Sequence, residues 1–265
     1  MSNPHGEHIW YELLTTDLVA AQRFYGDLLG WQFTDSGQNH YHVVTNHLGG
    51  EALAVAGAMT LTTEMQNGGA KPCWLGYIGV EDVDTSLKRL TAAGAAVLMP
   101  AWDIPDIGRM ALLSDPQGIP FYIMRGASRE PSLAFAFDRP RIGHCAWNEL
   151  VTPAPDAAWK FYSEEFHWEK DGEMDMGPMG KYEFIRHRPA SGGGVIGAVM
   201  PKPDAIPQGQ WNYYFRVADI DIAIDRIKAG GGQLLNGPDE IPGGEYSLQA
   251  LDPQGACFAL VGARK

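Results

Sequence analysis

Two glutamates at equivalent places in a repeated motif are the residues of this chain best suited to acid–base chemistry. Glu12 lies in the motif Trp10-Tyr-Glu-Leu-Leu-Thr15, and Glu149 lies in Trp147-Asn-Glu-Leu-Val-Thr152. A carboxylate among apolar neighbours is costly to keep ionised. It therefore either pairs with a cation or stays protonated to higher pH, which suits a general acid or base near neutrality. The alternative is a structural glutamate that is hydrogen-bonded to the backbone or to an arginine.

Each glutamate has a candidate tyrosine partner on a second strand-like segment. Tyr77 lies in the segment 74–80, and Tyr214 holds the same place in the segment 211–217. A glutamate and a phenol together bind a polar ligand, or abstract a proton next to a carbonyl group while the phenol stabilises the enolate oxygen. A strand tyrosine is otherwise a core aromatic residue whose hydroxyl reaches the rim.

Aromatic and basic side chains supply further candidates for ligand contact. Side chains alternate along a strand, so Trp10 shares a face with Glu12, and Trp147 shares a face with Glu149. The two tryptophans form aromatic walls for a flat ligand if that face lines a cavity, and otherwise they pack in the core. Arg109 is a candidate for binding an anion or for neutralising Glu12, with a solvated strand arginine as the competing interpretation.

The elements that must position these residues follow from the repeat itself. Asp115-Pro-Gln-Gly118 returns as Asp252-Pro-Gln-Gly255, at the offset of 137 residues that also relates the two glutamate motifs. A fixed period of this length indicates two copies of one domain rather than a solenoid of short repeats. We therefore predict a first domain at 1–126, a linker at 127–141 and a second domain at 142–265.

Each copy divides again into two similar halves. The first half has a strand-like run at 9–14, followed by an amphipathic helix that Asp17 opens and Gly30 ends. The second half begins again with a strand-like run and a helix. Short β-rich runs follow each helix, and the Asp-Pro-Gln-Gly turn joins the last two. The unit β-α-β-β-β thus occurs four times, and the insertions at 60–69 and 172–180 are predicted to be loops.

This order of elements resembles a known superfamily. A strand, an Asp-capped helix with Phe-Tyr, a Gly-Trp pair, three strands and an Asp-Pro-x-Gly hairpin are similar to the vicinal oxygen chelate superfamily. That group includes glyoxalase I, bleomycin-resistance proteins and extradiol dioxygenases, and the Trp-x-Glu-Leu-x-Thr pattern most resembles its tandem-domain, glyoxalase-like branch. The resemblance covers nearly the whole chain. It implies an α+β fold in which four βαβββ units pair into two glyoxalase-like domains, each with a curved-sheet cavity.

The resemblance also implies where the family's metal ligands would lie. In the first copy the positions on the first, fifth and last strands hold Trp10, Leu75 and Tyr122; in the second copy they hold Trp147, Asn212 and Ala259; the remaining middle-strand ligand falls near Gly57 and Gly197. A divalent ion needs several O, N or S donors that converge on one point. We therefore predict that both copies have lost the metal site and that no cofactor is required. The residues expected to contact a ligand are Trp10, Leu75, Tyr122, Arg109, Trp147 and Asn212.

Composition excludes several kinds of partner. The 265 residues carry a net charge of −12 without a basic run, which disfavours nucleic acid and anionic membranes. The N-terminus lacks the apolar stretch of a signal peptide, and no segment is long and apolar enough for a membrane span. Three cysteines in no CxxC spacing are typical of free thiols in a reducing compartment. We expect a cytoplasmic protein, monomeric or homodimeric, whose partner is a small molecule.

Three functions remain open at this point. The first is binding of a small organic molecule, aromatic or carbonyl-bearing, in a cavity without metal. The second is a metal-independent isomerase, lyase or cyclase that uses Glu12 or Glu149 as general acid or base. The third is the metal-dependent glyoxalase or extradiol dioxygenase chemistry that the resemblance implies, against which the substituted ligand positions count directly. One fold hosts many activities, so the fold alone does not separate them.

Overall fold

The computed structural model describes residues 3–38, 40–47, 50, 52–136, 140–188 and 194–265. The first copy forms an eight-stranded sheet in the order β2-β3-β4-β1-β5-β8-β7-β6. Its strands are β1 (His8–Thr15), β2 (Trp31–Asp35), β3 (Tyr41–Asn46), β4 (Leu53–Thr60), β5 (Cys73–Gly79), β6 (Ala96–Ile104), β7 (Gly108–Ser114) and β8 (Pro120–Gly126). Its helices are α1 (Leu18–Leu29), α2 (Thr63–Asn67) and α3 (Val83–Ala92).

The second copy repeats this plan in the order β10-β11-β12-β9-β13-β16-β15-β14. Its strands are β9 (Cys145–Thr152), β10 (Trp168–Asp175), β11 (Lys181–His187), β12 (Val195–Pro201), β13 (Gln210–Val217), β14 (Gln233–Ile241), β15 (Glu245–Leu251) and β16 (Cys257–Gly262). Its helices are α4 (Pro155–Phe166), the short 3-10 helix η1 (Gly177–Met179) and α5 (Ile220–Ala229).

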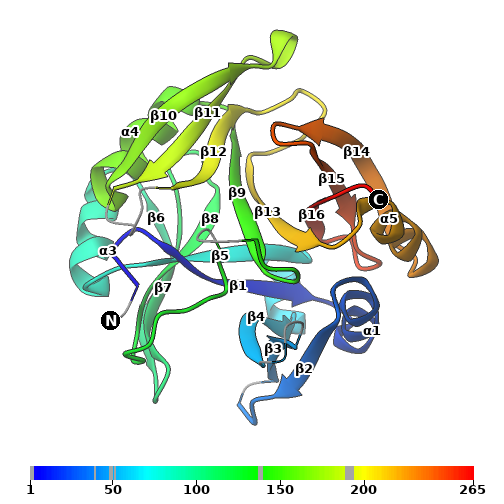
Figure 1. Cartoon of the computed structure of the whole chain (residues 1–265). Coiled ribbons are helices and arrows are strands. Elements are labelled where there is room, and N and C mark those ends of the chain that lie inside the picture. The colour runs from blue at the N-terminus through cyan, green and yellow to red at the C-terminus, as the bar shows by residue number, and fades with distance from the viewer. Residues whose placement is uncertain (1–2, 39, 48–49, 51, 137–139, 189–193) are drawn as a thin grey trace. The chain divides into compact units, whose positions relative to one another are not determined.

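The predicted α+β fold of four βαβββ units is confirmed (Figure 1). In each unit the first strand pairs in parallel with the last, as in β1 with β4 and β5 with β8, and the strands between them pair antiparallel. The helix starts are those expected from the sequence. The carboxylate of Asp17 accepts a hydrogen bond from the backbone N–H of Ala20 at 3.0 Å, and Gly30 ends α1 in the left-handed conformation with φ of 74°.

The prediction of loops at 60–69 and 172–180 is wrong in part. Helix α2 lies in the first insertion, because the hydroxyl of Thr62 caps it by accepting from the backbone N–H of Met65 at 3.1 Å. Strand β10 continues into the second insertion as far as Asp175, where it still pairs with Lys181 of β11. Among the described residues, no helix has the length and apolar character needed to cross a membrane.

The chain packs into two compact units that each combine halves of both copies. Unit 1 comprises Met1–Ile9, Gly76–Ser132 and Asn148–Trp211, and unit 2 comprises Trp10–Leu75, Leu133–Trp147 and Asn212–Lys265. Unit 1 therefore contains α3 of the first copy and α4 of the second, and unit 2 contains α1 and α5. The two helices of each unit contact one another and lie side by side in Figure 1. Residues 137–139 of the expected linker lie outside the described residues.

A buried hydrogen bond joins the two halves of unit 2. The hydroxyl of Tyr25, on α1, donates to Oδ2 of Asp252, in the hairpin before β16, at 3.1 Å. The same hydroxyl accepts from the indole N–H of Trp74 at 3.0 Å. The ring of Phe24 packs edge-on against Phe258 at 5.7 Å between centroids. The helix of the first copy is thereby fastened to the hairpin of the second.

Unit 1 contains the same arrangement with the copies exchanged. The hydroxyl of Tyr162, on α4, donates to Oδ2 of Asp115 at 3.1 Å and accepts from the indole N–H of Trp211 at 3.3 Å. The other oxygen of Asp115 accepts from the backbone N–H groups of Gln117 and Ile119, both at 2.9 Å. One aspartate thus fixes the tight turn within its own copy and binds the tyrosine of the other copy.

In unit 2 the backbone before β9 is held by two side chains of the first copy. The indole N–H of Trp31 donates to the carbonyl oxygen of Gly143 at 2.8 Å, and the amide of Asn46 donates to that of Ile142 at 2.7 Å. Trp31 and Asn46 face each other across β2 and β3. We call this set the Gly143 anchor.

In unit 1 the backbone before β1 is held in the same way, but by histidines. The indole N–H of Trp168 donates to the carbonyl oxygen of Gly6 at 2.8 Å, and Nε2 of His187 lies 2.7 Å from that of His5. His8 is enclosed next to this Gly6 anchor, with its ring stacked on Trp168 at 5.5 Å. Burial lowers the pKa of His8 to about 3 and the pKa of His187 to about 4, and neighbouring histidines add to both effects.

The Gly6 anchor makes unit 1 sensitive to acid. Both buried imidazoles stay neutral in the folded chain, whereas in the unfolded chain they gain protons below their ordinary pKa of 6.5. The unfolded state therefore binds more protons as pH falls, and stability is lost between pH 6.5 and the folded pKa values. The loss between about pH 7.5 and about pH 5.5 is on the order of 1 kcal/mol for each histidine.

Exchanging residues between the two anchors tests this expectation. His187→Asn, which copies Asn46, should lower the acid dependence of the urea midpoint by about 1 kcal/mol between these pH values. The matched change Asn46→His should add a similar dependence to unit 2. The readout is tryptophan fluorescence in urea titrations at both pH values. An unchanged slope in both variants would mean that other groups set the acid sensitivity.

Candidate functional site

Glu12 sits at the end of a hydrogen-bonded chain of three side chains in unit 2. The indole N–H of Trp10 donates to the hydroxyl oxygen of Tyr41 at 2.8 Å, and the hydroxyl of Tyr41 is hydrogen-bonded to the carboxylate of Glu12. Glu12 is only 3% exposed. Burial, followed by the charge of the Glu12 carboxylate, raises the pKa of Tyr41, so the phenol keeps its proton near neutral pH.

Strand register brings Tyr41 to Glu12. Glu12 on β1 faces Gly57 on β4, and Tyr41 on β3 faces Met59, two residues further along β4. The phenol must therefore reach across β4 to meet the carboxylate, and it passes over Gly57. A β-carbon on Gly57 would overlap the Tyr41 hydroxyl. The glycine at this position is thus required by the tyrosine that lies above it.

Cys73, at the start of β5, lies close enough to Glu12 to respond to its charge. Burial, and next the Glu12 carboxylate, raise the pKa of the Cys73 thiol to about 12. A protonated thiol is a poor nucleophile and a poor metal ligand, so Cys73 acts here as a small apolar group. Leu75, two residues later on the same strand, is buried.

The second copy has an equivalent pair in unit 1. The hydroxyl of Tyr182, on β11, donates to Oε2 of Glu149 at 2.9 Å, and Glu149 is also 3% exposed. Ala198 of β12 faces Glu149 and is therefore the structural counterpart of Gly57. The sequence alignment with Gly197 is wrong by one residue, because Gly197 faces Asn148 instead.

The other predicted residues of the first copy lie in unit 1. Tyr77 and Tyr122 face each other on β5 and β8, with their rings stacked at 4.1 Å. The guanidinium of Arg109 donates to the carboxylates of Asp84 at 2.9 Å and of Asp103 at 2.8 Å. Two carboxylates thus share the charge of Arg109 on the face of β7 that meets helix α3.

The other predicted residues of the second copy lie in unit 2. The hydroxyl of Tyr214 accepts from the side-chain amide of Gln249 at 3.0 Å. Trp147 packs against the buried cluster formed by Tyr214, Ala259 and Val261. Oδ1 of Asn212 lies 3.9 Å from the thiol of Cys257. These residues form one continuous cluster on strands β9, β13, β15 and β16.

Sequence reasoning did not find the tyrosines that bind the two glutamates. Tyr41 and Tyr182 are 141 residues apart rather than 137, because an insertion precedes the third strand of the second copy. A search for tyrosines that recur near, but not at, the main offset would have found them. Gln249, the partner of Tyr214, has no such signal.

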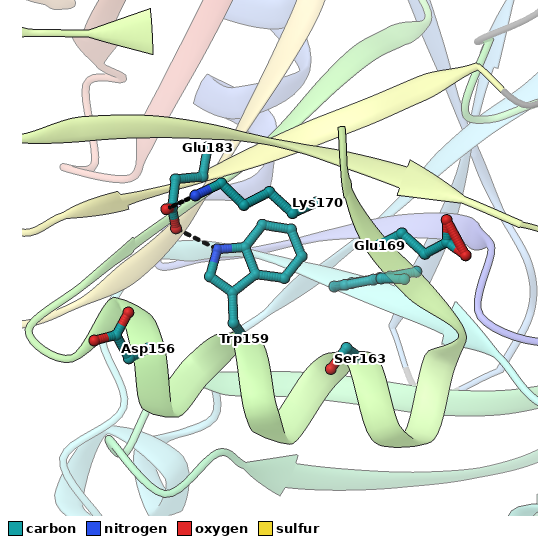
Figure 2. Close-up of a pocket in the computed structure, with 7 residues that line it drawn as sticks. Asp156, Trp159, Ser163, Glu169, Lys170 and Glu183 are labelled. Atoms are coloured by element: carbon teal, nitrogen blue, oxygen red, sulfur yellow. Dashed lines mark hydrogen bonds and ion pairs between the residues drawn. The ribbon is translucent and has the colours of Figure 1, made fainter. Parts of the chain in front are cut away.

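Unit 1 also has a surface hollow of about 480 Å³ between α4 and strands β10 and β11 (Figure 2). Glu183 faces it from the side of β11 opposite to Tyr182. Its Oε2 accepts from the indole N–H of Trp159 at 2.5 Å, and its Oε1 pairs with the ammonium of Lys170. Both oxygens are thus engaged in contacts that fasten α4 to the sheet, which makes this glutamate a structural element.

The residues at the family's metal-ligand positions offer a poor set of donors. An indole N–H, as in Trp10 and Trp147, has no lone pair for a metal, and Leu75 and Ala259 are hydrocarbons. Tyr122 is stacked on Tyr77. Over the described ranges, no group of three or more His, Cys, Asp or Glu side chains could hold a metal ion. These side chains do not fit the metal site that the fold family implies.

Sequence comparison identifies the family. The model of the glyoxalase/bleomycin resistance protein/dioxygenase superfamily matches residues 8–123 and again residues 141–260. The chain belongs to this superfamily. Each match coincides with one eight-stranded sheet, so the family's unit of sequence is the copy, whereas the compact units combine halves of both copies.

Relatives of similar length carry two kinds of name. The protein named "Putative glyoxylase CFP32" of Mycobacterium tuberculosis is 34% identical over 257 residues, covering 95% of this chain and 93% of the relative. "Anthracycline biosynthesis protein DnrV" of Streptomyces peucetius is 29% identical over 277 residues, covering 98% of this chain and 94% of the relative. These similarities extend over the whole tandem arrangement.

Solved structures agree with the fold. The Mn(II)-bound glyoxalase from Novosphingobium aromaticivorans superposes with a TM-score of 0.64 at 15% identity, covering 98% of this chain and 83% of that one. The 2,3-dioxygenase LapB from Pseudomonas sp. KL28 superposes with a TM-score of 0.65 at 13% identity, covering 98% and 92%. At such low identity the likeness concerns the fold alone.

Replacing Gly57 tests the geometry of the Glu12 site. Gly57→Ala should displace the Tyr41 phenol from Glu12 and destabilise the chain by about 1–3 kcal/mol, because the added methyl group occupies the place of the hydroxyl. Gly126→Ala is a matched control, since its β-carbon would meet only open space and one carbonyl oxygen at 4.0 Å. Urea denaturation measures both. Equal stability of the two variants would contradict the position of Tyr41.

Proposed function

We propose that this chain binds a small organic molecule, aromatic or carbonyl-bearing, at its glutamate–tyrosine sites, without a metal ion at the family's ligand positions. The observation that carries the proposal is the hydrogen-bonded chain from Trp10 through Tyr41 to Glu12. Polar groups of this kind orient a ligand, and the aromatic rings beside them supply apolar contact. Trp10 remains partly exposed, so one face of its ring is accessible.

The hydrogen-bonded chain stands where the family's metal ligands would be. Trp10 occupies the first-strand position, and its N–H is directed at a phenol rather than at an ion. The hydroxyl of Tyr41 lies over Gly57, which faces Glu12 and leaves that place on β4 without a side chain. Both features favour direct hydrogen bonding to a ligand over coordination through a metal.

Acid–base catalysis by Glu12 or Glu149 is the competing function. Both carboxylates are almost fully buried on a strand, as a general base in an apolar site would be. Each is, however, already engaged by a phenol, Tyr41 in the first copy and Tyr182 in the second. Such an arrangement fits a binding group better than a base that must receive a substrate proton. The relatives' names, one from glyoxylase chemistry and one from anthracycline biosynthesis, do not select a single ligand.

Metal content is the first test of this proposal. We expect purified, untagged protein to hold well below one transition-metal ion per chain after dialysis, because the implied ligand positions offer so few donors. Elemental analysis by mass spectrometry measures this. A stoichiometric Fe, Mn, Ni or Zn would overturn the metal-free proposal and redirect the work to glyoxalase and dioxygenase assays.

Ligand binding is the second test, and tryptophan fluorescence reports it. We expect 2-naphthol or 2-acetylnaphthalene, added at millimolar concentration, to quench part of the emission. Trp10→Phe should remove the component that arises at the Glu12 site. Trp159→Phe, in the surface hollow of unit 1, is the matched control and should leave that component intact. Failure of both compounds to bind, by fluorescence and by calorimetry, would count against the proposed function.

A further inference from the structure

The hydrogen bonds within the Glu12 site run in one direction. Trp10 gives its only polar hydrogen to Tyr41, and Tyr41 gives its only polar hydrogen to Glu12. An ionised carboxylate has no hydrogen to give. The three side chains therefore present lone pairs, on the carboxylate and on the phenol oxygen, and their own donors are already used.

The second copy has the same polarity at its corresponding pair. The hydroxyl of Tyr182 donates to Glu149 at 2.9 Å, so the tyrosine hydrogen is again engaged by the carboxylate. Cys73, beside Glu12, contributes only a weak thiol donor, because its pKa of about 12 keeps it protonated. The direction of hydrogen bonding is thus retained in both copies although their neighbouring residues differ.

We propose that the glutamate–tyrosine sites select ligands that donate hydrogen bonds, and that the ligand is a hydroxylated aromatic compound rather than a carbonyl compound. This inference rests on the proposed function and narrows its ligand class. A phenolic hydroxyl donates to the carboxylate in a charge-assisted hydrogen bond, which is stronger than a neutral one. The partly exposed ring of Trp10 offers a surface on which an aromatic ring can stack.

A carbonyl ligand is disfavoured for the same reason. Its oxygen would face the lone pairs of Glu12, and it would find the hydrogens of Tyr41 and Trp10 already donated. Burying an acceptor without a donor costs at least as much as a hydrogen bond gains. The arrangement also disfavours enolate formation, since the tyrosine hydrogen that would stabilise an enolate oxygen is bound to the glutamate. Tyr41 and Tyr182 are therefore positioning residues that fix the carboxylates as acceptors.

Three naphthalenes of nearly equal size test the inference by calorimetry on the full chain. 2-Naphthol carries a donor, 2-methoxynaphthalene replaces its hydrogen by a methyl group, and 2-acetylnaphthalene carries only an acceptor. We expect 2-naphthol to bind about tenfold more tightly than either of the others, which corresponds to one hydrogen bond to a charged group. Equal affinities, or tightest binding of 2-acetylnaphthalene, would overturn the inference while leaving the proposed function intact. No binding of any of the three would overturn both.

Variants separate this role from a merely structural one. The double change Glu12→Gln with Glu149→Gln supplies side-chain N–H groups, so it should abolish the preference for 2-naphthol. Glu183→Gln alters another buried glutamate and is the matched control that should preserve the preference. Melting temperatures show which variants fold.

Tyr41→Phe keeps the Glu12 site falsifiable if the double variant does not fold. It frees the indole N–H of Trp10, so 2-acetylnaphthalene should bind more tightly than to the parent chain, whereas a general loosening of the fold would weaken all three ligands. Uniform weakening would contradict the inference.

Discussion

A buried hydroxyl-to-carboxylate hydrogen bond between the two sequence copies is the interaction on which both compact units depend. Tyr25 donates to Asp252 in unit 2, and Tyr162 donates to Asp115 in unit 1. Burial raises the pKa of both aspartates, while the hydrogen bonds from the tyrosine and from the turn backbone lower it. An aspartate that lost its tyrosine would leave a buried oxygen unsatisfied, which is far more costly than the bond is worth. Formation of the hairpin turn and association of the two copies are therefore coupled through a single side chain.

This coupling explains why the most obvious repeats in the sequence are not the reactive residues. The Phe-Tyr pair on the first helix, the Trp on the fifth strand and the Asp-Pro-Gln-Gly turn all meet at this junction. The repeat was enough to predict the fold and the four βαβββ units. It could not predict which halves pack together, because an offset of 137 residues relates the copies equally well whether a half packs within its copy or with the other one. That choice is made by contacts such as Phe24 with Phe258, which link distant parts of the chain.

The candidate site was predictable only as far as a single strand reveals it. Period-two alternation was enough to single out Glu12 and Glu149 as residues that share a face with the tryptophan of the motif. Their tyrosine partners come from the third strand, and finding them requires the register of β3 on β4 and of β4 on β1. An insertion shifts that register in the sequence, so the recurrence of Tyr41 as Tyr182 is hidden at the main offset. Packing, rather than local pattern, decides such a pair.

The two copies have kept one framework and diverged in the residues that surround it. Gly57 is matched by Ala198, and Asn46 by His187, at places where the backbone pairing is otherwise the same. Recovering a metal site in the first copy would therefore take more than restoring a histidine at Trp10. A ligand side chain at Gly57 would collide with the Tyr41 hydroxyl, and moving Tyr41 would remove the only donor observed on the Glu12 carboxylate among the printed contacts of that phenol. The phenol and a β4 ligand compete for one position, so hydrogen bonding and metal coordination are alternative uses of the same fold.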